Sequence, residues 1–171
     1  MPDYNQNYSR QSGGYQGSNT RGNDSGFRKE KATFDFNPWN EKIKTWVRNE
    51  IDKETISFAD EFGGFIAGKA PNNKNEALTT SQIRIAFGEL RKIQMNGFNE
   101  EKTSFLMLKA KLAYAVKRHD KIGLTEFYNL FSKAYNEVDT KNVEAGTKQF
   151  DNLLQIIEAV LAYHKYHGGK E

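Results

Sequence analysis

From about residue 34 to the end of the chain, apolar residues recur three or four positions apart, which is the spacing of one side of an α-helix. No segment shows the sustained alternation of apolar and polar residues, bounded by hairpin turns, that is typical of paired β-strands. The pattern therefore predicts an all-α domain over residues 34–171. We expect a bundle of five or six helices, whose short connections favour antiparallel neighbours.

The first two helices are expected between residues 37 and 66. Asn37 suits the N-cap of a helix and Pro38 its first position, and apolar residues follow at helical spacing. A second, short helix is predicted to turn an apolar side that includes Ile56 toward the core. Gly63 and Gly64 are expected to weaken it, because glycine disfavours a helix interior. Residues 68–77 have the composition of a loop.

Capping signals mark the next two helices. Thr79 and Gln82 fit a capping box ahead of an apolar run, and Gly97 predicts the end of that helix. Asn99 is expected to cap a long helix that runs to about residue 119. Apolar residues surround this long helix almost entirely, which predicts that it lies at the centre of the bundle. Two more helices are expected over about residues 124–135 and 150–161.

Residues 1–33 differ from the rest of the chain in composition. Gly, Asn, Gln, Ser and Tyr dominate this segment, and such a polar stretch buries too little apolar surface to offset the entropy of ordering. We therefore expect a disordered N-terminal tail. Tyrosines at positions 4, 8 and 15 stand among arginines, as in low-complexity tails that bind RNA weakly. A solubilising leader is the interpretation that the composition favours.

Composition excludes several kinds of function. The chain has no cysteine, so disulfides, zinc fingers and thiol catalysis are excluded. No run approaches the roughly 20 apolar residues of a membrane span, and the polar N-terminus lacks a signal peptide, so we expect a cytoplasmic protein without a membrane partner.

Catalysis finds little support in the sequence. No phosphate loop, nucleophile elbow or paired-histidine motif is present, and no catalytic residue, metal or other cofactor is predicted. His164 and His167 have a spacing that suits a metal, but no third ligand is apparent, and a surface or partly packed pair is the preferred interpretation. One alternative stays open, namely a small helical nuclease in which folding brings together a pair of carboxylates that are distant in the sequence.

Charge is concentrated in one central stretch. The chain carries a net charge of +3, whereas residues 79–119 alone hold eight basic and three acidic residues. A solvated helix surface and a surface that binds phosphates are both compatible with this stretch. At 100° per residue, Arg84, Gly88, Arg91 and Met95 fall on one side of their helix. A glycine there indicates the close approach of a neighbouring helix or of a sugar-phosphate backbone.

The following helix also has a basic and aromatic side, formed by Met107, Lys111, Tyr114 and Arg118. Such a side suits a nucleic-acid backbone, because lysine and arginine neutralise phosphates. The alternative is that it packs on another helix and leaves its basic groups at the rim, as in a protein–protein adaptor. Seven of the eight basic residues between positions 79 and 119 are the candidate RNA-binding residues, namely Arg84, Arg91, Lys92, Lys109, Lys111, Lys117 and Arg118.

Three stretches resemble signature segments of the small subunit of type III-A CRISPR effector (Csm) complexes. They are LTTSQIR (residues 78–84), LKAKLAYAVKR (108–118) and FDNLLQIIEAVLAYHKYHGGK (150–170), in the family's order. The resemblance does not reach the N-terminal tail. It implies a small helical bundle without enzyme activity.

The resemblance also implies a place in an antiviral ribonucleoprotein. Several copies of the small subunit stack beside backbone subunits that hold the CRISPR guide RNA, and they line the groove where target RNA pairs with it. They bind RNA backbone rather than sequence, because base pairing supplies specificity. Cleavage of RNA belongs to the backbone subunits, and signalling and DNA cleavage to the large subunit. Arg84, Lys111 and Arg118 match basic positions of the family's motifs.

Overall fold

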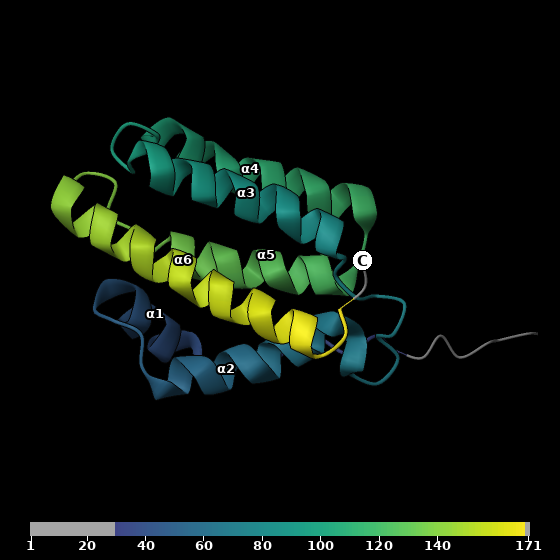
Figure 1. Cartoon of the computed structure of the whole chain (residues 1–171). Coiled ribbons are helices and arrows are strands. Elements are labelled where there is room, and N and C mark those ends of the chain that lie inside the picture. Colours follow the sequence, from purple (N-terminus) through teal and green to yellow (C-terminus); the bar gives the residue numbers. More distant parts are fainter. Residues whose placement is uncertain (1–29, 170–171) are drawn as a thin grey trace, which may run out of the picture.

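The computed structural model describes residues 30–169, which form six α-helices arranged in three layers of two (Figure 1). No strand occurs in this part of the chain, so the predicted all-α bundle is confirmed. Most of the predicted tail, up to residue 29, lies outside the described residues. A π-helical turn, η1 (Phe65–Lys69), continues the second helix. The helices are α1 (Asn40–Arg48), α2 (Lys53–Gly64), α3 (Thr80–Asn96), α4 (Lys102–His119), α5 (Ile122–Tyr135) and α6 (Val143–Tyr166).

The helix at the centre of the bundle is α6. It packs against α1, α2, α3 and α5, and α5 and α6 together form the middle layer between the α1–α2 and α3–α4 layers (Figure 1). Each fully buried apolar side chain contributes about 1.5–3 kcal/mol relative to an exposed one, so α6 supplies a large share of the core. Its buried apolar residues are Phe150, Leu153, Leu154, Ile156, Ile157 and Val160.

The prediction that the long fourth helix is central was wrong, because α4 lies in an outer layer and packs mainly on α3 and α5. Three of its residues are buried, namely Phe105, Leu108 and Leu112. On its solvent side, Leu106 and Met107 are exposed. Some of the apolar residues around α4 are therefore exposed to solvent. The sequence alone did not distinguish them from residues of the core.

The predicted capping box is confirmed at the start of α3. The Gln82 N–H donates to the Thr79 hydroxyl oxygen (3.3 Å), and the Thr79 N–H donates to the Gln82 side-chain oxygen (3.0 Å). Gly97 follows α3 with φ of 97°, a backbone conformation that glycine adopts without strain. This helix begins and ends where its local signals predict.

Two predicted helix starts were wrong. Residues 37–39 form a turn in which the Asn37 N–H donates to Asp35 (2.9 Å), and α1 begins only at Asn40. Asn99 likewise lies in a turn, and α4 begins at Lys102 after Glu101. In both places a short turn precedes the first residue of the helix.

Gly63 and Gly64, which were predicted to weaken the second helix, are the last two residues of α2, and the π-helical turn η1 follows them. Both are buried, and a Cβ at Gly63 would lie 2.7 Å from the Tyr163 Cβ and 2.8 Å from the His164 backbone nitrogen. The absence of a side chain at Gly63 therefore lets α2 approach α6 closely. Ile56, which was expected to face inward, is 42% exposed.

His164 is buried in the bundle, with its Nε2 atom 2.9 Å from the Leu78 carbonyl oxygen. Gly169 lies against the ring, because a Cβ there would overlap it. Burial lowers the pKa of His164, although the hydrogen bond to Leu78 opposes this effect. The neutral ring donates its Nε2–H to that carbonyl.

We expect this histidine to make the fold sensitive to mild acid. Its lowered pKa means that the unfolded chain takes up the proton first, so the free energy of unfolding decreases as pH falls below the ordinary histidine value of about 6.5. One proton limits the slope to about 1.4 kcal/mol per pH unit. Urea denaturation should show this loss in the wild type and a smaller one in His164→Gln. Equal slopes for the two proteins would contradict the prediction.

None of the helices over residues 30–169 combines the length and the hydropathy that crossing a bilayer requires.

Candidate nucleic-acid interface

Helices α3 and α4 lie side by side as one outer layer of the bundle (Figure 1). The Lys111 Nζ atom lies 2.9 Å from a carboxylate oxygen of Glu89, which ties the two helices together near their middles. A small pocket between them is lined by Gln82 and Ile85 at the start of α3 and by His119 at the end of α4. The two helices are therefore antiparallel, and their oppositely directed ends bring Arg84 and Arg118 to the same end of the layer.

Four of the seven candidate cations project into solvent without a partner. Each is exposed, and none makes a hydrogen bond or ion pair with another residue in the described part of the chain. The interaction of Lys92 with Glu101 is a longer-range electrostatic attraction and not a direct contact. Helical geometry places them on the outward side of the layer, which we call the α3–α4 face. They are Arg84, Lys92, Lys117 and Arg118.

The other three candidates already have partners. Arg91 turns toward α6, where it pairs with Glu158, and it also donates to Gln94 (2.7 Å). Lys109 turns the other way, toward α5, and donates to Asn136 (3.0 Å). Lys111 forms an ion pair with Glu89. The predicted set thus divides into an outward group and a group that holds helices together.

Gly88 lies in the middle of the α3–α4 layer with open space beside it. A Cβ at this position would meet no atom within 4 Å, so no neighbouring helix of the described chain accounts for the glycine. Large apolar side chains lie exposed on the same layer, with Ile85 73% and Met95 84% exposed on α3 and Tyr114 69% exposed on α4. The layer therefore combines unpaired cations, an open backbone position and uncovered apolar surface.

The charge of the α3–α4 layer contrasts with that of the opposite layer. Residues 40–64, which include α1 and α2, hold four basic and six acidic residues. In the α3–α4 layer, hydrogen bonds from Ser104 and Asn96 lower the pKa of the Glu101 carboxyl and keep it ionised, but this acid lies at the turn that joins the helices. The two outer layers thus carry net formal charges of opposite sign, and a positively charged surface attracts anions.

The two histidines of α6 do not come together as a metal site. His164 contacts Leu78, whereas His167 lies 2.5 Å from an Asp60 carboxylate oxygen and 2.7 Å from the Lys69 Nζ atom. Over residues 30–169, no group of three or more histidine, aspartate or glutamate side chains is placed to hold a metal ion.

Comparison with known families identifies the family of this chain. A family model described as Csm2 Type III-A matches residues 53–170, which is well over half of the chain. The matched range begins at the first residue of α2 and includes every later helix, and with them the whole α3–α4 face. No curated protein and no solved structure gives a match.

Proposed function

The chain belongs to the Csm2 Type III-A family, which makes it a type III-A CRISPR effector subunit, and we propose that its α3–α4 face binds RNA backbone. In this proposal the protein is a non-catalytic small subunit. It lines the groove where guide and target RNA pair and stabilises the bound target during antiviral defence. Its setting is the cytoplasm.

The observation that carries this proposal is the group of exposed, unpaired cations on the α3–α4 face. Arg84, Lys92, Lys117 and Arg118 give up no contact with the described part of the chain when they meet a phosphate, and each contact releases counterions from the RNA. Lys111 can contribute while it remains beside Glu89. Arg91 and Lys109 must first leave Glu158 and Asn136, so they contribute less.

Two further features support backbone recognition rather than sequence reading. Gly88 leaves room for a sugar-phosphate backbone to lie directly against α3. Tyr114 is exposed beside the cations of α4, where its ring can stack on a base of any identity. Neither feature distinguishes one base from another, which fits a complex in which the guide RNA supplies specificity.

The proposed partners are guide RNA, target RNA, the backbone and large subunits of the complex, and further copies of this chain. The exposed apolar residues Ile85 and Met95 favour protein contacts, because uncovered apolar surface marks interaction sites. They also support a second candidate function, in which the chain is a protein–protein adaptor that does not touch RNA.

We expect the purified full-length chain to bind single-stranded RNAs of unrelated sequence with similar affinity and to leave them intact in magnesium or manganese. Backbone contacts carry no sequence information, and no catalytic site is proposed. Fluorescence anisotropy and gel analysis of the same samples measure both properties. Strong sequence preference, or cleavage that disappears when one of the chain's carboxylates is changed, would overturn the proposal. Absence of RNA binding even within the assembled complex would favour the adaptor.

A further inference from the structure

Helix α5 carries a buried carboxylate that has no cation beside it. Glu126, in the second turn of the helix, is 4% exposed, and its Oε2 atom accepts a hydrogen bond from the Asn129 side chain (3.0 Å). No lysine, arginine or histidine among residues 30–169 forms an ion pair with it. Glutamate is seldom buried without a charged partner, because removal of a charge from water costs free energy. One hydrogen bond uses only part of the acceptor capacity of a carboxylate, so Glu126 can still accept further donors.

A pocket of about 340 Å³ opens beside this carboxylate, between α5 and the segment that precedes α1. The Ser132 Oγ atom, on the same helix, is buried and has no hydrogen-bond partner in the described part of the chain. The helix contributes oxygen-bearing side chains to the lining and the preceding segment contributes two aromatic rings, namely Glu126, Asn129 and Ser132 together with Phe34 and Phe36. We call this the Glu126 pocket.

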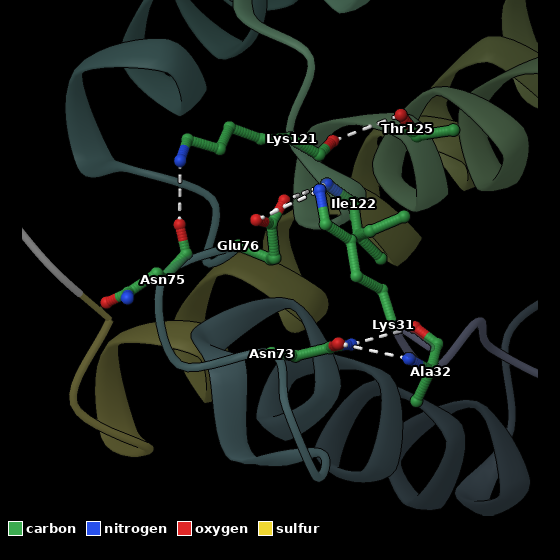
Figure 2. A network of polar contacts seen from close by, with 8 residues as sticks. All are labelled: Lys31, Ala32, Asn73, Asn75, Glu76, Lys121, Ile122 and Thr125. Carbon is green, nitrogen blue, oxygen red and sulfur yellow. Dashed lines mark hydrogen bonds and ion pairs between the residues drawn. The ribbon is translucent and has the colours of Figure 1, made fainter. Parts of the chain in front are cut away.

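A network of polar contacts holds the aromatic part of the lining in place, as Figure 2 shows. Asn73, which is 1% exposed, donates a hydrogen bond to the Ala32 carbonyl (2.8 Å) and accepts one from the Ala32 N–H (3.1 Å). One carboxylate oxygen of Glu76 lies 3.1 Å from the Lys31 Nζ atom, and the other accepts a hydrogen bond from the Ile122 N–H (3.3 Å) at the start of α5. These contacts fix the backbone just before the two rings and tie it to the helix that carries the carboxylate.

The cations near the Glu126 pocket are engaged elsewhere. Lys133 lines the pocket, but its Nζ atom lies over the Phe36 ring, 5.1 Å from the ring centre. Lys109 reaches this part of α5 from α4 and donates to Asn136 (3.0 Å). The cation that would neutralise the buried carboxylate is therefore not supplied by residues 30–169.

A second, smaller pocket adjoins the first along α5. It has a volume of about 190 Å³, shares Lys133 and Asn136 with the Glu126 pocket and reaches Asn40 at the start of α1. The Oδ1 atom of Asn40 is buried and has no hydrogen-bond partner among the described residues. Buried polar atoms in proteins almost always have such partners. The unpartnered oxygens of the two pockets thus point to a ligand that supplies hydrogen-bond donors.

We propose that the Glu126 pocket binds an arginine side chain from another protein subunit, with the guanidinium against the Glu126 carboxylate. Arginine fits better than lysine, because its five N–H donors form a rigid fork that matches a carboxylate and its flat face stacks on aromatic rings. A nucleic-acid backbone is itself anionic and would be repelled by the buried carboxylate. This inference rests on the proposed place of the chain among the subunits of an effector complex, but not on RNA binding by the α3–α4 face.

The pocket is tested by competition between wild-type chain and Glu126→Gln for a limiting amount of the other subunits during reconstitution of the complex. Glutamine keeps an oxygen for the Asn129 hydrogen bond but removes the charge. The variant should enter the complex about tenfold less well, because the partner's guanidinium would be buried without a counter-charge. In isolation the variant should melt at the same or a higher temperature, since a buried charge without a cation is gone. Mass spectrometry of the purified complex gives the ratio of the two chains.

The matched control is Glu144→Gln, which removes an exposed carboxylate from the first turn of α6 and should enter the complex like wild type. Equal incorporation of Glu126→Gln and wild type would overturn the inference. Reduced incorporation together with a lower melting temperature would overturn it too, because the carboxylate would then serve the bundle itself. If Glu126→Gln enters normally while Arg84→Ala/Arg118→Ala loses target-RNA binding, the pocket fails and the proposed function stands. The reverse result leaves the pocket standing and contradicts the proposed RNA binding.

The kind of side chain is tested on the isolated full-length chain with two blocked tripeptides, in which arginine or lysine lies between two glycines. The arginine peptide should shift the backbone amide NMR signals of Glu126, Asn129 and Ser132, and Glu126→Gln should lose these shifts. Equal shifts from the two peptides, including none from either, would overturn the choice of arginine. Shifts of the same signals by single-stranded RNA would assign the pocket to nucleic acid and overturn the proposal.

Discussion

Arg84→Ala/Arg118→Ala is expected to weaken target-RNA binding by the assembled effector complex about tenfold, similarly for targets of unrelated sequence. Both side chains are exposed at the same end of the α3–α4 face, and neither has a protein partner among residues 30–169. Loss of either therefore removes a phosphate contact and leaves no buried group unsatisfied. The assembled complex is the right setting, because several copies act together and multivalency amplifies weak sites.

The matched control is Lys53→Ala/Lys148→Ala, which removes two exposed cations from α2 and α6. It lowers the net charge by the same amount and should leave RNA affinity nearly unchanged. Exposed charges contribute about 0–1 kcal/mol to stability, so both variants should melt like the wild type. An Arg84→Ala/Arg118→Ala variant that folds but does not assemble would contradict the RNA role and show that the face packs on a neighbouring subunit.

Gly63→Ala is expected to destabilise the bundle by about 1–3 kcal/mol. The added methyl group overlaps the Tyr163 Cβ and the His164 backbone nitrogen, so α2 must move away from α6, and a backbone atom cannot give way as a flexible side chain can. Each kcal/mol corresponds to a decrease of about 2–4 °C in Tm for a domain of this size. Thermal unfolding followed by circular dichroism measures the change.

Gly88→Ala is the matched control for this substitution and should have the opposite sign. A Cβ at Gly88 meets no atom within 4 Å, and alanine is favoured over glycine in a helix interior by about 1 kcal/mol. Similar effects of the two substitutions would show that α2 and α6 are not in the close contact described above.

The structural features that the sequence predicted correctly depend on residues that lie close together in the chain. The Thr79–Gln82 capping box joins residues three positions apart, so it was visible before folding. Gly63 was noted only for its low helix propensity, since its close contact lies on α6, about a hundred residues later. The exposed side of α4 was misassigned for the same reason, because partners elsewhere in the chain decide which of its apolar residues are covered.

In the candidate interface, too, the sequence predicted what depends on residues close together in the chain and missed what depends on distant partners. The outward direction of Arg84 followed from helical spacing alone. That Arg91 pairs with Glu158 and that Lys109 contacts Asn136 depends on where α6 and α5 pack, which periodicity does not reveal. The contacts of Asn73 with Ala32 and of Glu76 with Lys31 gave no sequence signal, because an asparagine and a glutamate are ordinary residues in a polar loop.

The most direct test of the α3–α4 face is the dependence of target-RNA affinity on salt concentration. Complexes assembled with wild-type chain, Arg84→Ala/Arg118→Ala and Lys53→Ala/Lys148→Ala would be compared in a plot of log affinity against log salt. If the two arginines contact phosphates, their removal lowers the slope by up to about 0.9 for each arginine, and the control keeps the wild-type slope. Equal slopes for all three complexes would contradict the account.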